Sequence, residues 1–185
     1  MENLQLNDVI RELIVLDLIC QDEKLNLNIA IFGGSSLLLH LGDDLFRSTR
    51  DIDYTVDAFS SGEKLEKIMD MMPGYFHNLG GHPEFPDKEL YKEHGIEYKE
   101  WEGIQFKNLK FFLPSIEMIA LSKLMSKREK DLEDLKTTPM LNKCDLNKLK
   151  EFIDDCQTYL FNTVEYNFHE WDDILKLRGL SQSLS

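Results

Sequence analysis

A chain of 185 residues is long enough to bury the core of one compact domain and too short for a multidomain assembly. Hydrophobic residues make up 42% and charged residues 30% of it, with 10 glycines and 5 prolines, a composition that excludes disordered and fibrous proteins. The 34 acidic residues outnumber the 21 basic ones and give a formal net charge of −13, which excludes a protein that coats nucleic acid.

The cysteines and the first residues of the chain favour a cytoplasmic protein. Cys20, Cys144 and Cys156 lie far apart and form no CxxC pair, so we expect reduced thiols rather than a zinc or redox site. The start has no cationic region followed by an apolar run, and no stretch approaches the roughly 18 apolar residues of a membrane span. We therefore expect a cytoplasmic protein without a membrane partner.

The first part of the chain is predicted to form a helix and then a buried strand. Residues 5–22 have apolar side chains at mostly helical spacing, which predicts an amphipathic helix. Residues 25–32 are rich in Leu and Ile and end at Gly33 and Gly34, as is typical of a buried strand ending in a tight turn.

A second helix and a second strand follow. Ser35 or Ser36 is placed to cap a short helix that ends at Gly42. In residues 51–56, apolar and polar side chains alternate, which predicts a strand with one buried face. The other predicted elements are a helix at 62–72, a long loop at 73–95 that could contain a short strand, a two-stranded hairpin at 96–114 that turns near residues 102–103, a long helix at 115–136, and helices at 145–162 and 167–177.

These elements predict an α/β (α+β) fold with a small mixed β-sheet flanked by helices. We expect a first domain at residues 1–136. Residues 137–185 are expected to form a C-terminal helical extension packed on it.

Two carboxylates on the second predicted strand are candidate metal ligands. Asp51 and Asp53 are expected on the same strand face, about 7 Å apart along the backbone. Hard oxygen ligands at this spacing suit Mg²⁺ or Mn²⁺, which take their remaining ligands from water and triphosphate oxygens. The alternative is a pair of solvated acids on an exposed strand face.

The glycine turn before the short helix is a candidate phosphate site. Gly33 and Gly34 let backbone N–H groups approach an anion, and the helix start and the Ser35 hydroxyl would lie beside the β- and γ-phosphates. The alternative is a plain strand-to-helix turn. A phosphate site and a metal site on neighbouring strands would together bind a nucleoside triphosphate.

The stretch IAIFGGSSLLLHLGDDLFRSTRDIDYTV resembles the nucleotidyltransferase superfamily typified by DNA polymerase β, in which a Gly-Ser turn precedes an Asp-x-Asp strand. It is similar to the AbiEii-type bacterial branch, whose pattern has GG[ST], a short helix and R-x-[ST]-x-D-I-D. That branch adds a helical Lys followed by a basic-Asp-x-x-Asp run, and KLMSKREKDLEDL supplies Lys123, Lys130, Asp131 and Asp134. The similarity spans residues 29–135.

The long predicted helix carries its polar residues on one face. Lys123, Lys127, Asp131 and Asp134 fall at offsets 0, 4, 8 and 11. Lys123 could neutralise triphosphate charge or orient the base, and Asp131 or Asp134 could position the acceptor or support the metal. The alternative is a solvated helix face with i,i+4 ion pairs.

The resemblance implies that an acceptor hydroxyl attacks the α-phosphate of a nucleoside triphosphate and releases pyrophosphate. It implies Mg²⁺ or Mn²⁺ as cofactor, tRNA or protein as possible acceptors, and a toxin role with an antitoxin partner. The implied catalytic residues are Asp51, Asp53, Lys123 and Asp131, the first two also holding metal, and the implied nucleotide-binding residues are Gly33, Gly34, Ser35 and Arg47.

A third metal-binding carboxylate, which many members of the superfamily use, has no clear match in this sequence. Glu97, Glu100 and Glu102 lie on or near the predicted hairpin. Without a third carboxylate, a non-catalytic nucleotide-binding or partner-binding module becomes the alternative to an enzyme. An antibiotic-modifying nucleotidyltransferase is a further alternative.

Overall fold

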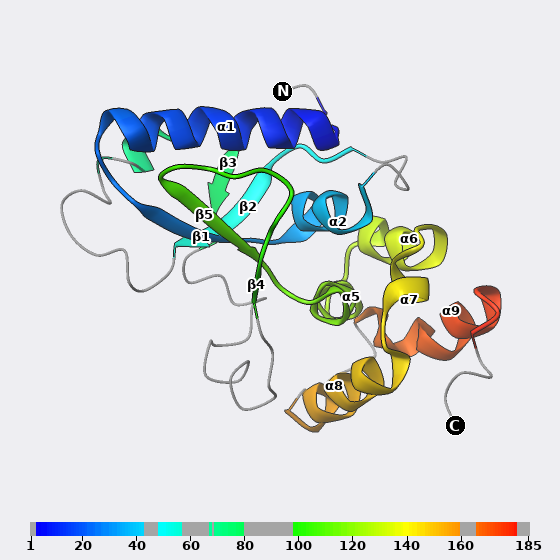
Figure 1. The fold of residues 1–185 in the computed structure, drawn as a ribbon. Coiled ribbons are helices and arrows are strands. Elements are labelled where there is room, and N and C mark those ends of the chain that lie inside the picture. The colour runs from blue at the N-terminus through cyan, green and yellow to red at the C-terminus, as the bar shows by residue number, and fades with distance from the viewer. Residues whose placement is uncertain are drawn as a thin grey trace. The chain divides into compact units, whose positions relative to one another are not determined.

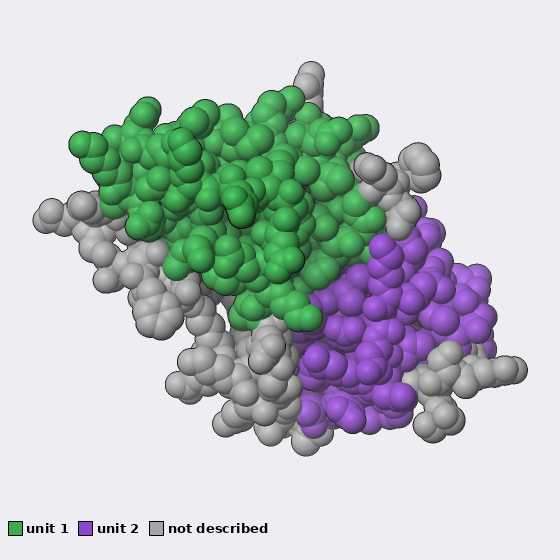
Figure 2. Space-filling view, in the orientation of Figure 1, with its two compact units in different colours: residues 1–82, 97–114 green, residues 83–96, 115–185 purple. Residues whose placement is uncertain are grey.

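The computed structural model describes residues 3–42, 48–56, 67, 69–79, 98–159 and 166–180. The chain divides into two compact units, coloured separately in Figure 2: residues 1–82 with 97–114, and residues 83–96 with 115–185. The expected domain boundary after residue 136 lies inside the second unit.

The first unit contains a mixed β-sheet. Within the described residues it has five strands in the order β3-β2-β1-β5-β4. β1 pairs antiparallel with β2 and parallel with β5, β2 pairs parallel with β3, and β4 pairs antiparallel with β5. This sheet confirms the predicted α+β fold. The strands are β1 (Leu27–Ile31), β2 (Ile52–Val56), β3 (Phe76–Asn78), β4 (Lys99–Glu100) and β5 (Leu109–Leu113).

Two helices accompany the sheet in the first unit. α1 (Leu6–Asp22) runs along one face of the sheet, and α2 (Gly33–Leu41) follows β1 directly (Figure 1). The core lies between α1 and the strands, and it confirms the helical and alternating patterns predicted for 5–22 and 51–56. Its largest fully buried side chains include Leu13, Leu16, Ile29, Ile31, Ile52 and Phe111. Of the helix predicted at 62–72, the structure describes residues 67 and 69–72, and 67 and 69–71 are helical.

The predicted hairpin forms, but its strands are shorter and their connection is longer than expected. β4 and β5 pair with Glu100 opposite Phe112, and residues 101–108 join them in place of a tight turn at 102–103. The connection is long because it packs on the sheet: the Trp101 ring stacks on Phe111 with ring centroids 5.1 Å apart. The connection therefore packs against the core before the chain enters β5.

A buried carboxylate on α1 fixes the end of that connection. Asp17 is 6% exposed and accepts hydrogen bonds from the backbone N–H groups of Lys107, Asn108 and Leu109, at 3.3, 2.7 and 2.9 Å. Burial by itself raises the pKa of Asp17, but these N–H groups and the Gln21 amide outweigh it, so the pKa lies below its ordinary value of 3.8. Asp17 thus ties α1 to the start of β5.

Replacing Asp17 by asparagine is expected to lower the free energy of unfolding by about 2–3 kcal/mol, because backbone N–H groups lose a charged acceptor. The folded pKa is lowered, so the contribution is present above the unfolded pKa and disappears as the pH falls through the folded pKa. Urea unfolding at neutral and acid pH measures both effects. Asp22→Ala on the same helix is the control, since Asp22 is exposed. A wild-type advantage that persists in acid contradicts this role for Asp17.

The second unit is helical. Ser115 caps its first helix, with the Ser115 hydroxyl oxygen 3.4 Å from the backbone nitrogen of Met118. Its described elements are α5 (Ile116–Leu124), α6 (Glu129–Thr137), α7 (Met140–Lys143), α8 (Leu146–Tyr159), the short 3-10 helix η3 (Asn167–Glu170) and α9 (Trp171–Leu177). The helix expected at 145–162 is present over 146–159, and its last three residues lie outside the described residues. The helix expected at 167–177 is present with a 3-10 first turn.

The single long helix predicted at 115–136 is wrong. The chain leaves the helix after Leu124 and starts a new one at Glu129. Ser126 is the physical reason, because its hydroxyl oxygen accepts the backbone N–H of Arg128 at 3.0 Å and so replaces a helical hydrogen bond with a local turn. The apolar spacing alone could not reveal this interruption.

The cysteines are free thiols, as predicted: Cys20 is buried, and Cys144 and Cys156 are half-buried. Burial, together with the nearby Asp17 charge, raises the pKa of the Cys20 thiol to about 11. In the described part of the chain, no helix is both long and apolar enough to cross a membrane.

Candidate functional site

The start of α2 differs from the prediction in one respect. The helix begins at Gly33 itself, with Phe32 as its N-cap residue, so the prediction of Ser35 or Ser36 as the cap is wrong. Ser35 is fully buried, and its hydroxyl donates to the backbone oxygen of Asp51 at 2.6 Å. Ser35 therefore fixes the backbone of the first aspartate of the D-x-D motif.

Further contacts hold the approach to β2 in place. The Thr49 hydroxyl also donates to the backbone oxygen of Asp51, at 3.3 Å. The Phe32 backbone N–H donates to the backbone oxygen of Asp53 at 2.8 Å. The end of β1 and the start of α2 are thereby bonded to both aspartates through their backbones.

The Asp53 carboxylate lies against the first residue of α2. Gly33 has φ +61°, and a Cβ built on it would lie 2.4 Å from Oδ2 of Asp53. Only glycine tolerates this backbone conformation without strain and leaves room for the carboxylate. The Asp53 carboxylate thus lies at the N-terminus of α2. The first backbone N–H groups of a helix lack helical partners.

A histidine approaches the other oxygen of Asp53. In the parallel pairing of β2 with β3, His77 is the register partner of Asp53, and its Nδ1 lies 3.2 Å from Oδ1. The sequence placed His77 in the loop predicted at 73–95, and no periodicity in that stretch signals the three-residue strand β3. His77 is therefore a site residue that the sequence reasoning missed.

Two of the three candidate third carboxylates, Glu100 and Glu102, lie away from this site. Glu100 lies on β4, which β1 and β5 separate from β2, a distance of about 14 Å at the usual strand spacing. Its carboxylate lies 3.4 Å from the Lys110 ammonium on β5, and Glu102 follows β4 as an exposed residue. Glu97 lies outside the described residues, as does Arg47.

The donor groups at the D-x-D motif fit a hard divalent cation in part. Asp51 is exposed and the Asp53 side chain is 24% exposed, so both carboxylates are accessible oxygen donors. Among the described residues, no group of three His, Cys, Asp or Glu side chains is arranged to hold a metal ion. Two carboxylates suit Mg²⁺ when water and substrate phosphates complete its ligands.

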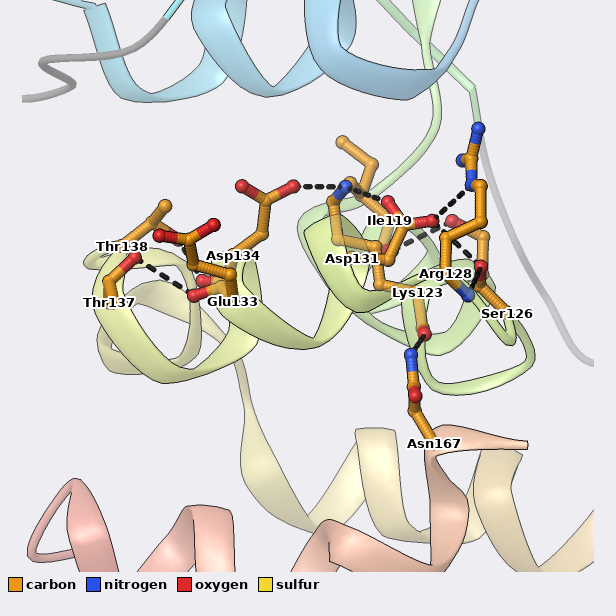
Figure 3. Close-up of polar contacts among 11 residues, drawn as sticks. Ile119, Lys123, Ser126, Arg128, Asp131, Glu133, Asp134, Thr137, Thr138 and Asn167 are labelled. Carbon is orange, nitrogen blue, oxygen red and sulfur yellow. Dashed lines mark hydrogen bonds and ion pairs between the residues drawn. The ribbon is translucent and has the colours of Figure 1, made fainter. Parts of the chain in front are cut away.

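The second unit contains a buried ionic cluster, shown in Figure 3. The Lys123 ammonium lies 2.8 Å from Oδ1 of Asp131 and 2.6 Å from Oδ2 of Asp134, and all three side chains are at most 7% exposed. Asp131 and Asp134 are three residues apart on α6 and project toward the Lys123 side chain of α5. The predicted partners do meet, but across a turn between two helices rather than along one helix.

Asp131 is the most strongly held member of this cluster. The Ser126 hydroxyl donates to its Oδ2 at 2.7 Å, and the Arg128 Nε lies 2.6 Å from the same oxygen. Burial raises the pKa of Asp131, but the charge and hydrogen bond of Lys123, then Ser126 and Arg128, outweigh burial and lower it from the ordinary 3.8. Asp131 is therefore a buried, ionised carboxylate.

Residues near the C-terminus close over the end of α5. The Asn167 side chain donates to the backbone oxygen of Lys123 at 2.9 Å, and its backbone N–H donates to the backbone oxygen of Ser126 at 3.0 Å. The Lys127 ammonium lies 4.9 Å from the centre of the Tyr166 ring. The prediction that Lys127 shares one helix face with the acidic residues is wrong, because residues 125–128 leave the helix.

A mixed sheet in which a glycine turn and short helix connect β1 to an Asp-x-Asp strand defines a nucleotidyltransferase-like domain. The sequence comparison agrees: residues 5–176 match the model of a family described as nucleotidyltransferase of unknown function (DUF6036), and the chain belongs to this family. No curated protein and no solved structure matches the chain significantly.

Proposed function

We propose that this protein transfers a nucleotidyl group from a nucleoside triphosphate to an acceptor hydroxyl. The observation that carries the proposal is the Asp53 carboxylate held against Gly33, at the N-terminus of a nine-residue helix. A helix N-terminus attracts phosphate oxygens, and a neighbouring carboxylate attracts the cation that accompanies them. The family supports a nucleotide as substrate.

One set of residues is proposed to bind the triphosphate and another to bind the metal ion. The backbone N–H groups of Gly33, Gly34 and Ser35 bind the triphosphate, while the Ser35 hydroxyl keeps its bond to the Asp51 backbone. Asp51 and Asp53 hold Mg²⁺ or Mn²⁺, which when bound stabilises the negative charge on the reacting oxygens. Arg47 remains a proposed phosphate contact.

The reaction is a displacement at the α-phosphorus. The acceptor oxygen forms a bond to this phosphorus, the bond to the oxygen that bridges the α- and β-phosphates breaks, the hydroxyl proton passes to water, and pyrophosphate leaves. The protein orients the two reactants in line. The fixed backbones of Asp51 and Asp53 serve that orientation, since both carbonyl oxygens accept hydrogen bonds from the α2 side.

For Lys123 and Asp131 we propose a positioning role. A lysine that is 4% exposed and bonded to two carboxylates stabilises the junction of α5 and α6. This role differs from the direct triphosphate contact expected from the sequence. The pair then supports activity through the fold of the second unit.

Calorimetry with each nucleoside triphosphate and Mg²⁺, followed by a label-transfer assay, tests the proposal. We expect binding that depends on Mg²⁺ and transfer of the α-phosphate label to RNA, protein or a small acceptor. Absence of Mg²⁺-dependent binding of any triphosphate would contradict the proposed nucleotidyl transfer.

Replacing Gly33 by alanine tests the contact that carries the proposal. The variant is expected to lose Mg²⁺-triphosphate binding, because the new Cβ would displace the Asp53 carboxylate. Gly42→Ala is the matched control: Gly42 has φ +62°, but among the described residues no atom beyond its chain neighbours lies within 4 Å of a built Cβ. Each substitution should cost about 1–3 kcal/mol of stability through backbone strain, measured by denaturant unfolding. Equal triphosphate binding by the two variants would contradict the proposed site.

The similarity to the AbiEii-type branch extends the proposal to the toxin of a toxin–antitoxin pair. Expression of the wild-type chain in bacteria is then expected to stop growth, and expression of Asp53→Asn is expected to leave growth normal. Growth arrest by both proteins, or by neither, would argue against a toxin that works by nucleotidyl transfer.

One observation favours a second candidate function. Since no group of three His, Cys, Asp or Glu side chains in the described residues is arranged to hold a metal ion, the domain could bind nucleotide without turnover and act as a sensor. Mg²⁺-dependent triphosphate binding without label transfer to RNA, protein or small molecules would identify this module.

A further inference from the structure

A cavity of about 510 Å³ opens in the first unit beside Asp51. Arg50, Asp51 and His77 supply its ionisable side chains, and Tyr75 and Asn3 also line it. The volume lies within the range of small-molecule sites. Of the residues that line it, only Asp51 has a role in the function proposed above.

Backbone hydrogen bonds hold the walls of the cavity. The backbone N–H of Leu4 donates to the backbone oxygen of Thr49 at 2.6 Å, and the N–H of Thr49 donates back to Leu4 at 2.9 Å, so the chain next to Asn3 is fixed beside Arg50. On the other side, the N–H of Ile52 donates to the backbone oxygen of Tyr75 at 2.8 Å. The cavity is therefore part of the sheet framework.

Arg50 is the cation of this cavity. It is exposed, and within the described part of the chain its guanidinium makes no hydrogen bond or ion pair. In a protein with 34 acidic residues, an arginine without a carboxylate partner at a cavity indicates an anionic ligand. A guanidinium binds phosphate through two parallel hydrogen bonds.

The position of the cavity indicates which reactant it takes. The described residues that line it include Asp51 but neither Asp53 nor Gly33, which form the proposed triphosphate end of the site. In an in-line displacement, the attacking and leaving oxygens lie on opposite sides of the phosphorus. The cavity shares Asp51 with the proposed metal site but not the residues of the triphosphate end, so the second reactant is the one left for it.

We propose that this cavity binds the acceptor, and that the acceptor is a nucleotide with a free hydroxyl whose phosphate is bound by Arg50. The inference rests on the proposed nucleotidyl transfer. Tyr75 offers a ring for base stacking, and the Asn3 amide offers both a donor and an acceptor of hydrogen bonds. The net charge of −13 opposes a long nucleic-acid track, so the site holds one terminal nucleotide or a free one.

Binding measurements without triphosphate test the assignment. The probes are adenosine 5′-monophosphate and a short single-stranded RNA with a free 3′ hydroxyl, and the variants are Arg50→Gln and Arg50→Lys. We expect Arg50→Gln to weaken the binding of the bound probe at least about tenfold, with partial recovery in Arg50→Lys. Mg²⁺-triphosphate binding should stay within about twofold of wild type, because Arg50 lies outside the triphosphate end. Arg11→Gln is the control, since Arg11 is an exposed arginine on α1 of the same unit.

The outcomes separate this proposal from the proposed function. Binding of the monophosphate identifies a free nucleotide as acceptor, and binding of the RNA alone identifies a strand end. Binding of neither probe, loss of triphosphate binding in Arg50→Gln, or label transfer to protein hydroxyls that is unchanged in Arg50→Gln would each overturn the acceptor assignment. If wild type binds a probe through Arg50 but transfers no label, the nucleotidyltransferase proposal fails while the nucleotide site stands.

Discussion

Replacement of Lys123 by methionine is expected to destabilise the second unit by about 3–5 kcal/mol. The substitution leaves the carboxylates of Asp131 and Asp134 buried, 3% and 5% exposed, without the ammonium that lies between them. Removing one partner of a buried ion pair costs far more than the loss of a surface ion pair. Urea unfolding followed by circular dichroism measures the change.

Lys150→Met is the matched control for this experiment. Lys150 forms an ion pair of the same length with Asp154, 2.6 Å, on α8 of the same unit, but the two side chains are 50% and 59% exposed. We expect the control to cost less than about 1 kcal/mol. Equal effects of the two substitutions would show that the Lys123 cluster does not stabilise the fold.

A neutral version of the cluster tests the cause of the destabilisation. The triple variant Lys123→Met, Asp131→Asn and Asp134→Asn should recover much of the loss, since no unpaired charge stays buried. The pH dependence provides a second check. The folded pKa of Asp131 is lowered, so its stabilising contribution is present above the unfolded pKa and is lost as the pH falls through the folded pKa. The gap between wild type and Lys123→Met should therefore narrow in acid.

Replacement of Asp53 by asparagine is expected to reduce nucleotidyl transfer by about 10²–10³-fold. Asparagine keeps the shape of the side chain beside Gly33 and His77 but removes the negative charge at the N-terminus of α2. The fold should tolerate this change, because the Asp53 backbone keeps its bond to Phe32. Initial rates of label transfer, with unfolding curves for the same samples, measure the two effects separately.

Glu100→Gln is the matched control for Asp53→Asn. Glu100 is an exposed carboxylate on the same sheet, and β1 and β5 separate its strand from β2. Transfer should be unchanged in this variant. A comparable loss of activity in Glu100→Gln would make Glu100 a third functional carboxylate and contradict its separation from β2 in the sheet.

Local patterns predicted the part of the site that depends on consecutive residues. The alternation around Asp53 reveals a strand, because Ile52 and Tyr54 must both face the core, and these two side chains are 0% and 2% exposed. The glycines after β1 reveal the turn into α2. Sequence reasoning placed the N-cap of that helix three or four residues too late, because Gly33 begins the helix at a positive φ without any side-chain cap.

Contacts between distant residues could not be predicted. His77 reaches Asp53 through a three-residue strand that is too short to show a period. Arg50 lines a cavity because Leu4 forms a β-bridge with Thr49, 45 positions later in the chain. This bridge holds the N-terminal residues beside Arg50. Lys123 was expected to share a helix face with Asp131, but a hydroxyl at Ser126 breaks the helix and brings the same residues together across a turn.

The fate of the two ends of the triphosphate tests the central claim most directly. Wild-type protein is incubated with Mg²⁺, candidate acceptors and a nucleoside triphosphate labelled either at the α- or at the γ-phosphorus. We predict that the α label becomes attached to the acceptor and the γ label is released as pyrophosphate, and that both events are lost in Asp53→Asn. Attachment of the γ label to the acceptor, or release of inorganic phosphate without any attached α label, would contradict nucleotidyl transfer.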